Sequence, residues 1–362
     1  MSSTYGENLK LSIFGQSHGH AVGMVLDGIP AGQAVDPVRL QEFMDRRAPG
    51  HSTISSHRKE TDRPEFMGGI VDGFTCGAPI AAVIYNQDHH SNDYDDLKNR
   101  PRPGHADFTA YIKYGGYQDA AGAGHFSGRL TAPLCIAGGL CKQWLEAMGI
   151  EIGAHISRIE NVTDNGFDAL SPQFDKIGKD FPTLDRICGN QMQDAIEQAQ
   201  ASGDSVGGII ECAVTGLQAG IGEPMFAGIE SKIAQIVFGI PGVKGVEFGL
   251  GFDSSRCMGS YCNDAFCVTD GKIRTLTNHC GGIQGGISNG MPVMFRVAVK
   301  PTPSIARQQQ TVDLKSGEEV SICVKGRHDP CIVPRAVPVV EAAAAIAIYD
   351  LILGNTQTEG RK

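Results

Sequence analysis

Three glycine-containing turns in the first part of the chain carry histidines that could do acid–base chemistry. The first is the segment 15–20, GQSHGH, in which a small turn presents Ser17 and His18 at the end of a predicted strand. Histidine is the side chain best suited to donate a proton near neutral pH, so His18 could protonate a departing anion. Taken alone, the segment is more typical of a surface histidine in a glycine turn, and its residue order differs from that of a nucleophile elbow.

The second turn is the segment 102–107, RPGHAD, in which proline and glycine predict a rigid loop. His105 can take its orientation from the carboxylate of Asp107, two residues later. An imidazole held in this way can bind the electron-rich edge of a ring. The nearby run Asp88–His90 is more typical of a solvated polar loop.

The third turn is the segment 122–129, GAGHFSGR, which runs directly into the start of a predicted helix. Its backbone N–H groups, the helix dipole and Arg129 together suit an anion or the edge of an isoalloxazine ring. The segment is neither a Walker loop, because no Gly-Lys-Ser/Thr follows, nor a dinucleotide-binding fingerprint, because the glycine spacing differs. A glycine-rich loop that merely packs closely on a helix is the alternative.

Three further segments gather cations. Lys300–Ser304 (KPTPS) offers one cation and two hydroxyls on a stiff backbone at a strand end, which suits a phosphate or a ribityl chain. Lys325–Arg335 holds three cations beside one imidazole and one carboxylate, and it precedes a predicted buried helix. Arg46 and Arg47, with the basic run 57–59, form another candidate anion site or else an exposed helix end and loop.

The composition excludes several classes of protein. With 362 residues, a formal net charge of -9 and 41% hydrophobic residues, the chain can bury a core and is a poor match for a nucleic-acid-binding protein. We expect neither a signal peptide nor a membrane span, because the most apolar stretch, 336–353, contains Glu341 and Asp350 and is typical of a buried helix. Eleven cysteines without a C-x-x-C pair indicate reduced thiols in the cytoplasm and no metal site. The even spacing of Cys257, Cys262 and Cys267 keeps metal binding as an alternative.

Periodicity and turn residues predict the elements that must position these segments. Predicted strands cover 9–14, 21–26, 79–85, 206–214, 292–299 and 321–324. Predicted helices cover about 37–46, 128–148, 191–201, 225–238 and 337–353. The first of these helices has Asp36 as N-cap and Pro37 at its first position, a common helix start.

Two internal repeats indicate a duplication. Residues 68–80 and 281–293 share a Gly-Gly-Ile start followed by glycines, a proline and an apolar residue at identical spacings. The segments 22–32 and 206–220 both run from Val-Gly through an apolar stretch to Ala-Gly and a predicted helix. We therefore predict a single α+β domain over 1–362, a β–α–β sandwich whose pseudo-symmetric halves cover about 8–150 and 200–353, with a ligand site at their junction. Chance recurrence in a glycine-rich chain is the alternative.

Five motifs in order along the chain resemble the chorismate synthase family, and the match extends from about residue 8 to 353. They are GQSHG at 15–19, RPGHAD at 102–107, GGI with GGIS at 281–288, KPT at 300–302 and RHDP at 327–330. The resemblance implies a flavin-dependent lyase that converts 5-enolpyruvylshikimate 3-phosphate to chorismate and phosphate in the shikimate pathway. It also implies a requirement for reduced FMN without net redox change, the β–α–β sandwich fold and a homotetramer.

The resemblance further implies roles for individual residues. His18 would protonate the departing phosphate, His105 would sit over the flavin pyrimidine edge, and Asp329 would assist proton transfer at flavin N5. The residues expected to hold the substrate are Ser17, Arg47, Ser127, Arg129 and Arg335. The residues expected to hold the flavin are His125, Phe126, Ser127, Pro241, Gly242, Gly285, Lys300, Pro301, Thr302, Pro303, Ser304 and Arg327.

Some positions depart from the family pattern. Gln16 stands where the family commonly has Glu, and Ala48, Thr53 and Ala121 stand where Arg is common. The positions proposed for NADP in the family are those of Arg47 and Thr53, and only Arg47 keeps the expected type. We therefore predict a monofunctional enzyme that receives reduced flavin from an external reductase.

Two other functions fit parts of the pattern. A flavin-dependent oxidoreductase would share the flavin loops but would not need so many arginines or a histidine directed at a leaving phosphate. A non-catalytic phosphometabolite-binding protein would need the arginines but not His18, His105 and Asp329.

Overall fold

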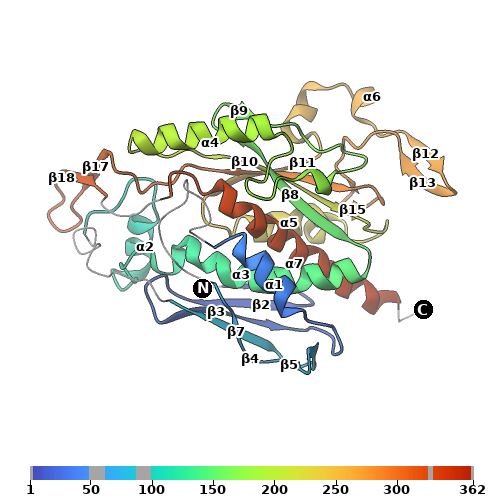
Figure 1. Ribbon diagram of the computed structural model, residues 1–362, viewed down its shortest axis with the longest axis horizontal. Coiled ribbons are helices and arrows are strands. Elements are labelled where there is room, and N and C mark those ends of the chain that lie inside the picture. The colour runs from blue at the N-terminus through green and yellow to red at the C-terminus, as the bar shows by residue number, and fades with distance from the viewer. Residues whose placement is uncertain (1–2, 49–61, 87–98, 325–328, 360–362) are drawn as a thin grey trace.

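The computed structural model describes residues 3–48, 62–86, 99–324 and 329–359, with the side chains of the last helix described up to residue 355. The chain forms a β–α–β sandwich in which a layer of helices lies between two sheets (Figure 1). The predicted α+β class is confirmed.

Each sheet has five antiparallel strands. The first has the order β1 (Thr4–Tyr5), β2 (Lys10–Gly15), β3 (Ala21–Asp27), β7 (Ile80–Tyr85) and β4 (Glu65–Gly68). The second has the order β9 (Val162–Thr163), β8 (Glu151–Ile159), β10 (Gly208–Thr215), β16 (Val293–Val299) and β11 (Val243–Phe248). Alternating burial along β7 shows that one face of the first sheet packs on the helices.

The helical layer contains α1 (Pro37–Asp45), α3 (Thr131–Ala147), α5 (Ile229–Val237) and α7 (Val333–Glu359). The helix α4 (Arg186–Ala201) covers the outer side of the second sheet, and α2 (Asp107–Tyr114) lies at one end of the molecule (Figure 1). The other elements are α6 (Gly259–Cys262) and the hairpins β5–β6 (Ile70–Val71, Phe74–Thr75), β12–β13 (Phe266–Thr269, Lys272–Thr275), β14–β15 (Ile283–Gln284, Ile287–Ser288) and β17–β18 (Gln308–Val312, Glu319–Cys323).

The centre of the sandwich is the contact between α3 and α7. A methyl group built on Gly138 would lie 2.3 Å from the Cβ of Ala342, so the two helices approach as closely as their backbones allow. The segment Val333–Asn355 of α7 is long and apolar enough to cross a membrane, but 89% of its most apolar window is buried inside the protein. It is the core helix that the sequence predicted, although it begins at Val333 rather than near residue 337.

The repeated sequence segments form the same hairpin in both halves. In the first half, Thr75 Oγ1 accepts from Gln33 N at 2.9 Å and donates to Pro30 O at 2.7 Å. In the second half, Ser288 Oγ accepts from Ile221 N at 2.9 Å and donates to Gln218 O at 2.5 Å. The repeated glycine spacing therefore encodes the repeated hairpins β5–β6 and β14–β15.

Several element boundaries differ from the sequence predictions. The helix α4 starts at Arg186 because Asp185 caps it, accepting from the backbone N–H of Ile187 and Cys188, five residues before the predicted start. The predicted helix 225–238 begins as the 3₁₀ turn Met225–Ala227, so α5 starts only at Ile229. The strands β8 and β11 were absent from the prediction, although β8 pairs along the whole of β10.

Candidate active site

A cavity of about 660 Å³ lies where the two halves meet, and it collects most of the residues singled out from the sequence. The first half contributes Ser17, His18, Arg47, His105, His125, Phe126, Ser127 and Arg129. The second half contributes Pro241, Gly242, Lys300, Pro301, Thr302, Pro303, Ser304, Asp329 and Arg335. A cavity therefore lies at the junction where the sequence analysis predicted a ligand site.

One described position among the predicted flavin contacts, Gly285, does not line this cavity. Gly285 lies in the turn of the β14–β15 hairpin with a φ of 64°, a conformation that favours glycine, and its place in the flavin site stays a prediction. Thr53 and Arg327 lie outside the described residues.

The turn that carries His18 is held by hydrogen bonds to Asn86 and to the glycine loop 122–124. Asn86 Nδ2 donates to Gln16 O at 3.1 Å and to Gly19 O at 2.8 Å, and Ser17 N donates to Gly124 O at 3.1 Å. The His18 Nδ1 and Ser17 Oγ atoms are 3.0 Å apart. A Cβ on Gly122 would lie 2.3 Å from His18 Cε1, so the absent side chain of Gly122 makes room for the imidazole. The first and third turns of the sequence therefore form one unit.

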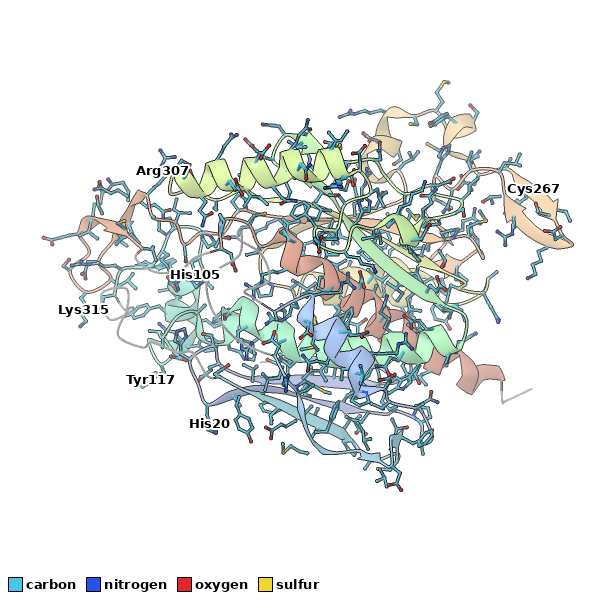
Figure 2. The ribbon with its side chains drawn as sticks, in the orientation of Figure 1. His20, His105, Tyr117, Cys267, Arg307 and Lys315 are labelled. Atoms are coloured by element: carbon cyan, nitrogen blue, oxygen red, sulfur yellow. The ribbon has the colours of Figure 1, made fainter. Side chains whose placement is uncertain are left out.

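His105 is oriented by Asp107, as the sequence predicted. The His105 Nδ1 and Asp107 Oδ1 atoms are 2.6 Å apart. Burial raises the pKa of Asp107, but hydrogen bonds from Arg102 and His105 outweigh it, and the pKa lies well below the usual range. The ionised carboxylate cannot donate, so the hydrogen of this contact is on His105 Nδ1. Figure 2 shows His105 at the end of the molecule where α2 begins.

Arg102 connects three parts of the site, a role that the sequence analysis did not assign. Its guanidinium donates to both carboxylate oxygens of Asp107, at 2.7 and 2.8 Å. It also donates to Ser304 Oγ at 3.2 Å and to Gly122 O at 2.6 Å. The side chain therefore ties the His105 loop to the strand end 300–304 and to the glycine loop behind His18. The spacing of Arg and Asp within RPGHAD is the signal that could have revealed it.

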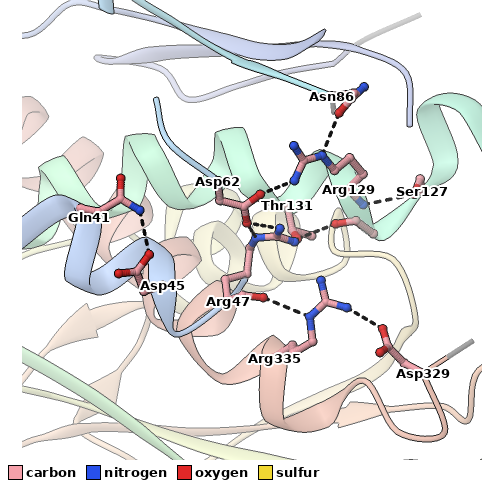
Figure 3. A network of polar contacts seen from close by, with 11 residues as sticks. Gln41, Asp45, Arg47, Asp62, Asn86, Ser127, Arg129, Thr131, Asp329 and Arg335 are labelled. Carbon is pink, nitrogen blue, oxygen red and sulfur yellow. Dashed lines mark hydrogen bonds and ion pairs between the residues drawn. The ribbon is translucent and has the colours of Figure 1, made fainter. Parts of the chain in front are cut away.

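Three of the predicted substrate arginines belong to one network (Figure 3). Arg47 and Arg129 both donate to the buried carboxylate of Asp62, with the Arg47 Nε and Asp62 Oδ2 atoms 2.9 Å apart. Arg335 donates to Asp329 Oδ2 at 2.5 Å and to Arg47 O at 3.0 Å. Burial lowers the pKa of Arg335, and this effect outweighs the nearby charge of Asp329, which raises the pKa. No motif recognised in the sequence includes Asp62.

The wall of the cavity is strongly cationic. Among the described residues that line it are one carboxylate, Asp329, and six cations: Arg47, Arg102, Arg129, Lys244, Lys300 and Arg335. Burial lowers the pKa of Lys300, and Lys244 lowers it further, as expected for like charges held close together. A chain with a net charge of -9 thus gathers positive charge at one place, which suits a ligand with several negative charges.

Comparison with known families gives a match along nearly the whole chain. Residues 9–353 match the family model described as chorismate synthase. The chain is 44% identical over 358 residues to a chorismate synthase of Dehalococcoides mccartyi, covering 98% of this chain and 97% of the relative. It is 46% identical over 349 residues to that of Korarchaeum cryptofilum, covering 96% and 97%, and 44% identical over 356 residues to that of Thermococcus kodakarensis, covering 98% and 99%.

The fold has a solved counterpart. A crystal structure of chorismate synthase superposes with a TM-score of 0.76 at 27% identity, covering 97% of this chain and 93% of that one. The sandwich fold that contains the cavity is therefore shared with this similar protein.

Proposed function

The chain belongs to the chorismate synthase family and is a carbon–oxygen lyase of the shikimate pathway, and from this premise we propose how its cavity works. We propose that it converts 5-enolpyruvylshikimate 3-phosphate to chorismate and phosphate by 1,4-anti-elimination with reduced FMN. The substrate loses a proton from C6 and phosphate from C3, so the reaction has no net redox change.

The cationic wall of the cavity is the observation that carries this proposal. The substrate has two carboxylates and a phosphate, and six lining cations against one carboxylate provide the opposite charge. Arginine is suited to this task because its planar guanidinium can hold carboxylate and phosphate oxygens in a fixed direction. Arg47, Arg129 and Arg335 are the proposed contacts, assisted by the hydroxyls of Ser17 and Ser127.

The remaining polar side chains fit the proton transfers. His18 is proposed to give a proton to the departing phosphate, and the Ser17 hydroxyl 3.0 Å from its Nδ1 orients the ring. Asp329, held by Arg335, is proposed as the acceptor for the proton that leaves C6. His105 is proposed to sit over the flavin pyrimidine edge, with its ring oriented by Asp107 at Nδ1.

The strand end 300–304 and the segment around Gly242 fit a flavin phosphate and ribityl chain. Thr302 Oγ1 is buried without a hydrogen-bond partner in the described part of the chain, so a polar ligand atom can satisfy it. Lys300 supplies the cation, and Gly242, whose φ of 94° favours glycine, also lines the cavity. When bound, reduced FMN would supply the transient electron donation that helps the phosphate to leave.

Anaerobic turnover tests this function. The purified protein is incubated with reduced FMN and 5-enolpyruvylshikimate 3-phosphate, and phosphate, chorismate and flavin oxidation are followed together. We expect equal amounts of phosphate and chorismate with the flavin still reduced at the end. Loss of one reduced flavin per product would instead identify an oxidoreductase, and binding without any phosphate release would identify a binding protein.

We further propose that the enzyme does not reduce its own flavin. Of the two positions proposed for NADP in the family, only Arg47 keeps its residue type, because Thr53 stands where arginine is common. An external flavin reductase then has to supply the reduced cofactor. NADPH consumption by the purified protein with oxidised FMN would contradict this proposal.

We also propose a cytoplasmic homotetramer. The segment 251–276 exposes apolar side chains, among them Phe252, Met258, Phe266, Val268 and Ile273. The β12–β13 hairpin with Cys267 projects at the opposite end of the molecule from His105 (Figure 2), where another subunit could cover it. All eleven cysteines are free thiols, as in a reducing compartment. Sedimentation as a monomer at micromolar concentration would contradict the tetramer.

A further inference from the structure

A buried carboxylate behind the cavity wall joins two of the proposed substrate arginines. The side chain of Asp62 has no exposed surface, and it lies between the guanidinium groups of Arg47 and Arg129. Arg47 binds it through both Nε and Nη2, and Arg129 binds the other carboxylate oxygen through Nη1 (Figure 3). Asp62 does not line the cavity, so it acts on a ligand only through these arginines.

Each arginine is also held by a neutral partner from a second direction. Arg47 Nη1 donates to Thr131 Oγ1 at 3.3 Å, and Arg129 Nε donates to Asn86 Oδ1 at 3.0 Å. A guanidinium group is planar, so two partners in different directions fix the orientation of its plane. Asp62 is the partner that the two arginines share.

The same network continues to the proposed proton acceptor. The carbonyl oxygen of Arg47 accepts from Arg335 Nε at 3.0 Å, and Arg335 Nη1 donates to Asp329 Oδ2 at 2.5 Å. A displacement of Arg47 would therefore move Arg335 and, with it, the carboxylate of Asp329. Asp62 thus influences both the anion contacts and a reacting group.

Charge explains why a carboxylate is needed here. Burial raises the pKa of Asp62, but Arg47 and Arg129 outweigh this effect, so the pKa lies below its ordinary value and the group stays ionised. Without that negative charge, two buried guanidinium groups would repel each other at short range. Removing one partner of such a buried group leaves the remaining charges uncompensated.

We propose that Asp62 is a positioning residue of the active site, which holds Arg47 and Arg129 in the arrangement that binds the substrate anions and, through Arg47 and Arg335, fixes Asp329. This inference rests on the proposed function and adds a residue to it. Asp62 is separate from the residues that contact substrate or cofactor, and its effect passes through three arginines.

The test compares Asp62→Asn with Glu341→Gln, a matched control. Glu341 is also a buried carboxylate that pairs with two cations, Arg46 and Lys142, but none of the three lines the cavity. The measurements are thermal unfolding, kcat and KM for turnover, and calorimetric binding of 5-enolpyruvylshikimate 3-phosphate. We expect Asp62→Asn to lower kcat/KM about 10²-fold, with higher KM and lower kcat, because a small misplacement of binding groups has effects of this size. Glu341→Gln should lower the unfolding temperature but leave kcat and KM at parental values, and Asp62→Glu should recover part of the loss.

Several results would overturn the inference. Equal kinetic effects of Asp62→Asn and Glu341→Gln would reduce Asp62 to a structural role. Tighter substrate binding by Asp62→Asn with unchanged kcat would mean that the carboxylate competes with the substrate. If Asp62→Asn does not fold, Thr131→Val loosens Arg47 without changing charge, and an unchanged KM in that variant would reject the inference.

The design separates this inference from the proposed function. A parent protein that binds the substrate but forms no chorismate would reject the function, while the two binding constants would still decide the role of Asp62. A parent protein that does not bind the substrate would reject both.

Discussion

Arg46 and Arg47 are neighbours in the sequence, yet they enter two different charge clusters. Arg47 joins Asp62 and Arg129 beside the cavity. Arg46 donates to both carboxylate oxygens of Glu341, at 2.9 and 2.7 Å, and Lys142 Nζ lies 3.4 Å from the same group. Both clusters consist of two cations and one carboxylate.

The difference between the clusters lies in what surrounds them. The Glu341 cluster joins α1, α3 and α7, and Ala154 N on β8 also donates to Glu341 at 3.3 Å, so its charges are used within the protein. The Asp62 cluster places two guanidinium groups on a cavity wall. Charged groups of the same composition therefore join elements of the core in one place and line a cavity in the other.

The largest expected effect is a loss of turnover from a substitution in the cavity wall. His18→Ala should lower turnover about 10²–10⁴-fold, because removal of a positioned acid typically has this effect. Flavin binding should remain close to that of the parent, because the proposed role of His18 is at the phosphate. Rates and flavin affinity are measured on the same preparation, and a near-parental rate would reject the assignment of His18.

The next effect is a loss of stability from a substitution in the Glu341 cluster. Glu341→Gln should lower the free energy of unfolding by about 3 kcal/mol, at the low end for a broken buried ion pair, because Arg46 remains partly in contact with water. Denaturant unfolding measures this change. A lower kcat without a stability change would show that the two clusters are not separate in function.

A substitution at Gly122 tests the cavity site without altering any charge. Gly122→Ala would place a Cβ 2.3 Å from His18 Cε1, on a residue whose φ is already 66°. We expect a displaced imidazole and a rate about 10²-fold lower. The matched control is Gly259→Ala, since Gly259 has open space around its Cβ position and lies far along the chain from the site. Equal rates in the two variants would contradict the proposed fit between Gly122 and His18.

The smallest effect concerns a third cluster, away from the cavity, in which His155 lies between two carboxylates. Its Nε2 is 2.9 Å from Glu211 Oε2, and its Nδ1 is 3.3 Å from Asp164 Oδ2. Burial lowers the pKa of His155, but Asp164 and Glu211 outweigh it and raise the pKa above its usual value. The stabilisation is therefore complete below the unfolded pKa of about 6.5 and is lost as pH rises through the folded pKa.

This pH dependence can be isolated by substitution. The free energy of unfolding of the parent minus that of His155→Gln should decrease as pH rises above about 6.5. Urea unfolding at several pH values measures the difference. A difference that does not change with pH, or a pH dependence that appears in kcat instead, would contradict a purely structural role for this histidine.

The sequence by itself determined much of the local structure. The Asp36-Pro37 start of α1 forms as predicted, with the Asp36 carboxylate accepting from Val38 N and Arg39 N, because capping depends on residues within one turn. The repeated glycine spacing also predicted the repeated hairpins, and RPGHAD predicted the contact between His105 and Asp107. The strands β8 and β11 could not be recognised in this way, because their pairing depends on distant strands of the second sheet.

Only the tertiary structure decided which charges meet. Arg46 reaches Glu341 across 295 residues of sequence, whereas its neighbour Arg47 reaches Asp62 across 15. No sequence motif marks either ion pair, because an ion pair requires opposite charges at short range and places no constraint on their spacing along the chain. Motifs and family resemblance predicted most of the residues that line the cavity, whereas the contacts of Asp62 and Arg102 form only when the chain folds and brings their partners within a few ångströms.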